Sequence, residues 1–274
     1  MRKKSRKRNG LREIPDELWN LIEPILPPDK PPGTNGRPRV PNRTVLNGIL
    51  YVLRTGCQWK MIPRPYGSGS TCHRRFQAWV QAGIFERIWR ACLQHYDDLR
   101  GIDWRFQSLD GVIVSAPVRG DQVGKDPTNR GKLGTKRHLL SDADGIPLAV
   151  TLSGANRHDM KQFGATLDAT VVPRPSPKKK PRQHLCCDKG YDYPELRRSA
   201  KRRGYIAHMK SRGQEEKERR KNPRFKARRW VVERTNRWHN LFRRLKIRYE
   251  VHAENYLGFV QFASAIICWR RAVA

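Results

Sequence analysis

The sequence predicts an α/β protein in which a mixed sheet is flanked by helices and is preceded by an N-terminal helical region. Two patterns lead to this prediction. Up to about residue 100, apolar residues recur at helical spacing, without the alternation typical of strands. From residue 101 onward, short strand-like runs alternate with helical segments. We therefore divide the chain into a helical region, residues 1–100, and an α/β region, residues 101–274.

The helical region has the general layout of a DNA-reading module. Its expected helices cover residues 15–25, 44–55, 59–62 and 71–81. Ser70 is the expected N-cap of the last helix. A short helix, a glycine-containing turn and a helix that carries Arg74, Arg75 and Gln77 are typical of a helix-turn-helix reader, and we expect these three side chains to contact DNA. The alternative is a plain helical bundle with a solvated basic face.

The α/β region opens with an antiparallel meander. Strands are expected over residues 106–115, 139–141, 146–152, 184–187 and 205–209. Helices are expected over residues 160–171, 194–203, 230–245 and 256–271. Turn residues DADG join the second and third strands into a hairpin. Pro147 suits an edge strand, because proline cannot donate to a ladder.

Charge is the strongest global signal in the chain. It holds 57 Lys and Arg against 25 Asp and Glu, a formal net charge of +32. Such an excess indicates a polyanionic partner, and nucleic acid is the first candidate because phosphate contacts release counterions. An anionic membrane surface is the competing partner. It is not favoured, because the sequence has neither a long basic amphipathic anchor helix nor an apolar run of about 18 residues.

Two basic loops and the N-terminus fit the same partner. Lys178, Lys179 and Lys180 lie in a proline-rich loop over residues 172–182, and we expect them to contact phosphate. The stretch 212–229 is equally basic. Solvated loops are the alternative for both segments. The basic segment 1–8 is either a solvated tail or an arm that lies on DNA.

Cysteine usage indicates a reducing compartment. The six cysteines form no CxxC pair, and no apolar stretch of a secretory signal follows the basic N-terminus. We therefore expect reduced thiols and a cytoplasmic protein. A zinc site is not expected, because Cys and His do not cluster at ligand spacing.

Two acids follow buried strand segments. Asp110 comes after the apolar start of strand 106–115, and Asp188 comes directly after strand 184–187. Ligands of a parallel α/β sheet gather at the carboxyl ends of its strands, so two neighbouring strands could bring these carboxylates together.

A third acid lies on the expected helix 230–245. Glu233 shares a polar face with Arg237, Asn240 and Arg244, opposite an apolar face. Three hard oxygen ligands suit Mg²⁺ or Mn²⁺, and a pair of such ions about 4 Å apart catalyses phosphodiester displacement. For Glu233 alone, the simpler alternative is an ion pair with Arg237 at i+4.

Other polar residues near these positions have simpler explanations. Asp192 competes with Asp188 as a ligand, but it could cap the helix that starts at Pro194. His158 could approach the site. Turn or capping roles account for Asp142, Asp144, Asn156 and Asp159.

At these residues the sequence resembles the DDE transposases of bacterial insertion sequences, whose catalytic domain has an RNase H-like fold. Four segments carry the resemblance in order: GRPRVPNRTVLNGILYVLRTGCQW, NRGKLGTKRHLLSDADGIPLAVTLSGANRHD, DKGYD and RRWVVERTNRWHNLFRRLKIRYE. The resemblance implies a catalytic triad of Asp110, Asp188 and Glu233 that binds Mg²⁺ or Mn²⁺. It also implies cleavage at the ends of a mobile element, transfer of the freed 3′-hydroxyl to target DNA, and a homodimer that pairs the two ends.

The glutamate helix matches the family with some departures. Arg229 matches the arginine of its signature, and we expect Arg229 and Arg237 to contact DNA. Lys226 and Asn240 stand where a common variant has Tyr and Lys, and Val112 stands where many relatives have Ser or Thr. Arg243 and Arg244 would then take over the phosphate contact of that lysine.

The expected function is thus that of an insertion-sequence transposase in a bacterial cytoplasm, associated with the nucleoid, with double-stranded DNA as its partner and no membrane. A non-catalytic nucleic-acid-binding protein derived from a transposase is the alternative. A structure-specific nuclease that uses the same metals without joining strands is a further one.

Overall fold

The computed structural model describes residues 11–29, 38–176, 182–209, 220 and 230–274. The N-terminal region holds α1 (Asp16–Ile22), α2 (Asn42–Thr55), α3 (Gly69–Gln81) and α4 (Ile84–Arg100). The strands are β1 (Phe106–Ser115), β2 (Gly124–Lys125), β3 (Leu133–Ser141), β4 (Pro147–Gly154), β5 (Gln183–Cys187) and β6 (Tyr205–Met209). The helices among and after them are α5 (Phe163–Asp168), α6 (Pro194–Arg202), α8 (Trp230–Asn240) and α9 (Ala253–Ala272).

The strands form one mixed sheet. Its order is β2-β3-β1-β5-β6, with β4 also paired to β3. β3 runs antiparallel to β1 and to β4, whereas β5 runs parallel to β1 and β6 parallel to β5. An antiparallel meander followed by two parallel strands is the arrangement of an RNase H-like sheet, so the predicted fold class is confirmed. Pro147 opens β4 at the edge of the sheet, as predicted.

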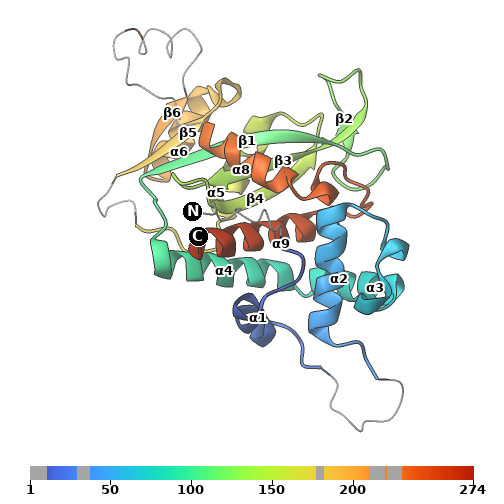
Figure 1. The fold of residues 1–274 in the computed structure, drawn as a ribbon. Coiled ribbons are helices and arrows are strands. Elements are labelled where there is room, and N and C mark those ends of the chain that lie inside the picture. Colours follow the sequence, from blue (N-terminus) through green and yellow to red (C-terminus); the bar gives the residue numbers. More distant parts are fainter. Residues whose placement is uncertain (1–10, 30–37, 177–181, 210–219, 221–229) are drawn as a thin grey trace, which may run out of the picture.

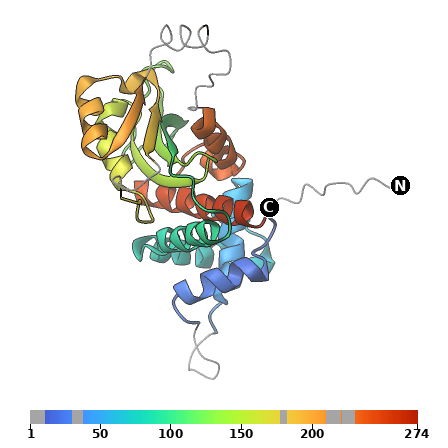
Figure 2. The same cartoon turned by 90° about the vertical axis from the view of Figure 1, so that its left-hand side faces the viewer.

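Helices cover both faces of the sheet (Figures 1 and 2). Asp110 and its cross-strand partner Leu139 lie on the face covered by α8, where Asn236 contacts Asp110. The next residue along β1, Gly111, lies on the opposite face, because side chains alternate along a strand. That face carries α5, since Thr151 of β4 hydrogen-bonds Thr166 at 2.6 Å. We call these two faces the α8 face and the α5 face.

Helix α9 lies between the sheet and the N-terminal helices (Figure 1). It is buried on nearly every side, as its apolar sequence predicts. Phe259 stacks on Phe76 of α3 with ring centroids 4.3 Å apart, and a Cβ at Gly258 would come within 2.6 Å of Val80. On its other side, Ser264 bonds His239 of α8 at 2.9 Å. The N-terminal helices and the sheet therefore share one continuous core.

One helix of the first region was not predicted. Helix α4 spans Ile84–Arg100 and packs along α9. Its buried residues recur at helical spacing and are Ile84, Phe85, Ile88, Trp89, Cys92, Leu93 and Tyr96. The signal was therefore present in the sequence.

The segment before α3 also differs from the prediction. The short helix expected over residues 59–62 is a single 3₁₀ turn, Trp59–Met61, and a second 3₁₀ turn, Arg64–Tyr66, follows it. Ser68, not Ser70, caps α3, because its Oγ accepts a hydrogen bond from the Thr71 amide at 3.1 Å. The partner helix that packs on α3 is α2, which ends at Thr55, and residues 56–68 separate it from the start of α3. The tight turn of a helix-turn-helix motif is thus not seen between α2 and α3.

The glutamate helix is shorter than predicted. Helix α8 ends at Asn240, and the chain turns through a 3₁₀ segment, Arg243–Leu245. The turn leaves Leu241 73 % exposed and carries Arg244 inward, where it forms an ion pair with Glu250 at 2.7 Å. This buried ion pair explains why the helical period does not continue to Leu245.

All six cysteines are unpaired, as expected, and five of them are buried. No helix in the described part of the chain is long and apolar enough to span a bilayer.

Candidate functional site

Asp110, the first predicted ligand, lies where the parallel pairing of β1 with β5 ends. Leu109 of β1 pairs with Cys187 of β5 as the last matched pair of these strands, and Asp110 and Asp188 come next in each chain segment. The pKa of Asp110 is raised to about 6, chiefly by burial and also by the neighbouring carboxylates of Asp188, Asp159 and Glu233. These three acids therefore lie within electrostatic reach of Asp110, and we call the four together the carboxylate cluster.

The structure separates Asp188 from its competitor Asp192. Asp188 is exposed and caps the 3₁₀ turn Lys189–Tyr191, where its carboxylate accepts the Lys189 amide. Asp192 does not cap α6 as expected. Its Oδ1 accepts Nε and Nη2 of Arg197 at 2.8 and 2.6 Å, so its charge is neutralised on the surface. Asp188, in contrast, follows the end of β5 next to the strand position of Asp110.

Glu233 projects from the first turn of α8, which crosses β1 and β3 (Figure 1). Its side chain is exposed, and no ion pair joins it to Arg237 in the described chain. The i+4 pair considered as an alternative is thus not formed.

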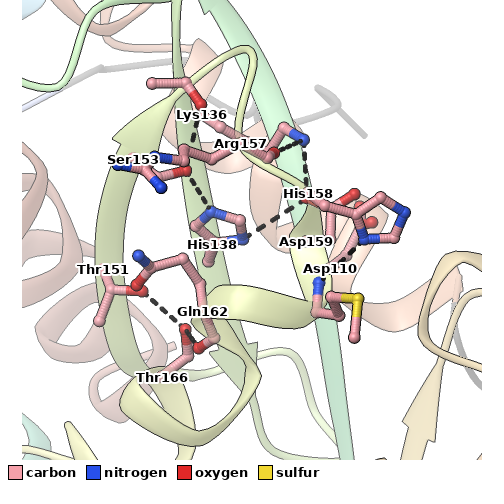
Figure 3. A network of polar contacts seen from close by, with 12 residues as sticks. Asp110, Lys136, His138, Thr151, Ser153, Arg157, His158, Asp159, Gln162 and Thr166 are labelled. Atoms are coloured by element: carbon pink, nitrogen blue, oxygen red, sulfur yellow. Dashed lines mark hydrogen bonds and ion pairs between the residues drawn. The ribbon is translucent and has the colours of Figure 1, made fainter. Parts of the chain in front are cut away.

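Asp159 is the member of the cluster that the sequence did not reveal. We expected it to cap a helix, but His158 is the N-cap of the turn Asp159–Gln162 and accepts the Met160 amide at 3.4 Å. The Asp159 carboxylate lies 3.0 Å from Nζ of Lys136 and 3.7 Å from Nδ1 of His138 (Figure 3). Burial lowers the pKa of His138 to about 4, so Lys136 is the only cation of this group at neutral pH.

Gly111 gives Asp159 its access to the sheet. A Cβ at this position would lie 2.8 Å from Oδ1 of Asp159 and 3.1 Å from Nδ1 of His138. Any larger residue would thus push the Asp159 carboxylate away from the strand. The glycine next to Asp110 places an acid from the α5 face within electrostatic reach of an acid on the α8 face.

A buried arginine supports Asp110 from the other side. Asn236 of α8 donates from Nδ2 to Oδ2 of Asp110 at 3.5 Å and accepts at Oδ1 from Nη2 of Arg137 at 3.2 Å. Arg137 is fully buried, and its Nη2 also donates to Asn240 at 3.4 Å. Asn240 therefore helps to hold the Arg137 guanidinium under α8.

The cluster has the chemistry of a divalent-cation site. Asp110 is a partly buried acid whose pKa is raised by burial and by three further carboxylates, and a bound cation would remove that cost. Carboxylate oxygens are the ligands that Mg²⁺ and Mn²⁺ prefer. In the described residues, however, no three acidic, His or Cys side chains stand as a ready ligand set for one ion. The residues fit the ion by donor type and charge, and two of the predicted ligands are exposed.

The raised pKa of Asp110 makes a prediction for the metal-free chain. The pKa is about 6 in the folded state and near 3.8 in the unfolded state, so the folded state binds a proton more tightly. Relative to Asp110→Asn, the wild-type chain should lose stability as the pH rises from about 4 to about 6, by up to about 3 kcal/mol. Urea unfolding of both proteins in EDTA at pH 4.5 and 7.5 measures this. If the free energies of unfolding of the two proteins differed by the same amount at both pH values, this prediction would be wrong.

The three DNA contacts predicted on α3 differ in exposure. Arg74 is exposed and Gln77 is partly buried. Arg75 is tied down, because its guanidinium donates to Oδ1 of Asn42 and lies over the Trp79 ring at 5.8 Å.

The predicted DNA contacts on α8 and in the turn after it also differ in exposure. Arg237 and Arg243 are exposed. Arg244 is 8 % exposed and is committed to Glu250, so it has no free face for a phosphate. Lys178, Lys179, Lys180 and Arg229 lie outside the described residues.

Asp142 and His158 are the other polar residues considered for the site. Asp142 is a turn residue, as expected, and its Oδ1 accepts the amides of Asp144 and Ile146 at 2.9 and 2.7 Å. His158 is exposed, and its Nε2 lies 3.4 Å from the Tyr193 hydroxyl. It therefore stands beside the segment that follows Asp188, at the rim of the cluster.

Comparison with known proteins adds independent information. A family described as "Transposase DDE domain" matches residues 103–266, and one described as "Putative transposase of IS4/5 family" matches residues 14–89. The "Putative transposase for insertion sequence element IS402" of Burkholderia cepacia is 37% identical over 162 residues, which are 58% of this chain and 74% of that protein. The "Insertion element IS402 uncharacterized 16.2 kDa protein" of the same organism is 40% identical over 118 residues, 42% of this chain and 80% of that protein.

Among solved structures, the catalytic domain of Mos1 mariner transposase is similar over 69% of this chain and 93% of that chain, with 12% identity and a TM-score of 0.30. A pre-cleavage Mos1 transpososome is similar over 89% of this chain and 82% of that chain, with 12% identity and a TM-score of 0.31.

Proposed function

This chain belongs to the DDE transposases of insertion sequences, and we propose that it cuts DNA at the ends of its element and joins them to a target. In this proposal the chain binds the terminal inverted repeats. Water then hydrolyses a phosphodiester bond at each end, which leaves a 3′-hydroxyl and a 5′-phosphate. Each 3′-hydroxyl attacks a target phosphodiester and displaces a target 3′-oxygen. The observation that carries the proposal is the carboxylate cluster around Asp110 in a strongly basic chain.

The three predicted acids have distinct proposed roles. Asp110 and Asp188 would ligate metal directly, and Glu233 would complete the ligand set from α8. When bound, two divalent ions activate the attacking oxygen and stabilise the leaving oxygen. Asp110 is held in place by β1 and by the Asn236 amide. Asp188 and Glu233 are exposed, so they can be reached by a phosphodiester that arrives from solvent.

Exposed cations near these acids are proposed to hold the DNA backbone. Arg237 lies one helical turn after Glu233, and Arg243 follows the end of α8. Arg74 on α3 is proposed to contact the inverted repeat. Lys178, Lys179, Lys180 and Arg229 lie outside the described residues, and their phosphate contacts remain predictions from the sequence. Because both ends must be held at once, we also propose a homodimer.

The test uses a duplex that carries the element's own ends, incubated with the purified full chain, with and without Mg²⁺. We expect Mg²⁺-dependent strand cleavage at the end junction, and joined products when an unrelated plasmid is added. Binding without cleavage would support a non-catalytic nucleic-acid-binding protein. Cleavage without joining would support a nuclease. Failure to bind the end duplex would contradict the proposal altogether.

A further inference from the structure

A polar pocket opens beside the carboxylate cluster. Its volume is about 600 Å³, and it lies between the segment that contains Gln122 and the loop that follows β4. The side chains that matter to the argument are Gln122, Ser153, Asn156, Arg157, Lys161 and Gln162. We call this cavity the β4-loop pocket.

The charge of the pocket is one-sided. Arg157 and Lys161 line it together with three amides, and no acidic side chain lines it. Neither cation forms an ion pair in the described chain, whereas several other arginines of the molecule do. A site with two unpaired cations and amide donors is suited to an anion that accepts several hydrogen bonds, such as a phosphodiester.

The backbone that carries these cations is fixed on both sides. The Arg157 amide donates to the Gly154 carbonyl at 2.9 Å, and the Arg157 carbonyl accepts Nζ of Lys136 at 2.9 Å (Figure 3). The Lys161 amide donates to the His158 carbonyl at 3.1 Å. Lys136 is buried, so its ammonium acts as an internal clamp on this loop. Such a clamp reduces the entropy that the loop would lose on binding a strand.

The same loop reaches the carboxylate cluster. Lys136 binds Asp159 as well as the Arg157 carbonyl, at 3.0 and 2.9 Å. Ser153 of the pocket wall bonds Nε2 of His138 at 2.9 Å, and Nδ1 of His138 faces Asp159 (Figure 3). The loop that carries the two unpaired cations is therefore connected through Lys136 and His138 to Asp159 of the cluster.

We propose that the β4-loop pocket is a subsite for the phosphodiester backbone of a DNA strand that crosses the carboxylate cluster, with Arg157 and Lys161 each contacting a phosphate. This inference rests on the proposed function. The strand has two sources, the element's end or the target. Both present the same phosphodiester chemistry, and the experiment separates them.

The test measures the salt dependence of DNA binding by the full chain without divalent ions. The probes are a duplex with the element's ends and an unrelated duplex, both from 50 to 200 mM KCl. For two lost phosphate contacts, Arg157→Ala/Lys161→Ala should flatten the slope of log Kobs against log salt by about 1.8. The matched control, Arg87→Ala/Arg270→Ala, removes two exposed charges from α4 and α9 and should leave the slope within about 0.5 of wild type.

The two probes identify the strand. A flatter slope on the end duplex assigns the pocket to the element's end, and a flatter slope confined to the unrelated duplex assigns it to target DNA. Equal slopes for wild type, pocket variant and control on both probes would overturn the subsite. If wild type itself bound neither probe, the proposed function would fail instead, so the two failures are distinguishable.

Discussion

Asp188→Asn should abolish Mg²⁺-dependent cleavage of end-bearing DNA while the folded chain still binds that DNA. The substitution keeps the size of the side chain and its acceptor for the Lys189 amide, but it removes the charge that a divalent ion requires. Loss of a metal ligand costs several kcal/mol of transition-state stabilisation, a rate loss of about 10³-fold or more. Cleavage under single-turnover conditions and DNA binding by anisotropy measure the two effects separately. Asp110→Asn should behave in the same way.

Asp192→Asn is the matched control. It changes the same chemical group four residues away, but Asp192 is paired with Arg197 in a partly exposed ion pair. Such a pair contributes about 1 kcal/mol or less to stability. We therefore expect Asp192→Asn to cleave within about threefold of wild type. If Asp192→Asn were inactive and Asp188→Asn active, the assignment of the second acid would have to be exchanged.

The sequence could predict those parts of the fold that depend on local patterns. Strand β1 forms where expected, and the β3–β4 hairpin forms around the expected turn residues, although β3 begins at Leu133 and not at Leu139. Because Asp110 and Asp188 adjoin apolar strand segments, their approach follows from strand order alone. Helix α4 has an equally clear helical period of buried residues. These elements are set by residues close together in the chain.

Asp159 could not be found in this way. Its place in the cluster depends on Lys136 and a neutral His138 of β3 and on the missing side chain of Gly111 of β1, and neither strand adjoins Asp159 in the sequence. Each of these residues has an ordinary local explanation. Only their meeting in space distinguishes an acid that faces Asp110 from one that caps a helix.

The faces of α8 were predicted only in part for the same reason. Val231 and Thr235 are buried as expected, but Asn236 and His239 are buried as well. A period of about 3.6 residues identifies which side chains share a face, whereas polar burial depends on partners supplied by other elements. The partner of Asn236 is Arg137 on β3, 99 residues earlier in the chain.

Arg137→Met should separate stability from activity. The Arg137 guanidinium is fully buried, and no acidic side chain pairs with it in the described chain. Burying a charge without a counter-ion is costly, so an apolar residue of similar length should leave the free energy of unfolding unchanged or raise it by about 1–4 kcal/mol. Cleavage should nevertheless fall about 10²-fold, because Asn236 loses the partner that orients it against Asp110. A variant that is both less stable and fully active would contradict this.

Asn236→Leu completes a double-mutant cycle with that variant. In the wild-type background it removes an acceptor from a buried guanidinium, so it should lower the free energy of unfolding by about 2–3 kcal/mol. In the Arg137→Met background no charge is left unpaired, and the cost should shrink by at least about 1 kcal/mol. Urea unfolding of the four proteins gives this coupling, and Asp110→Ala, which has no acceptor for the Asn236 amide, controls for loss of the weaker contact at 3.5 Å. An equal cost of Asn236→Leu in both backgrounds would show that the amide does not connect α8 to Arg137, and the link from Arg137 to Asp110 would then have to be abandoned.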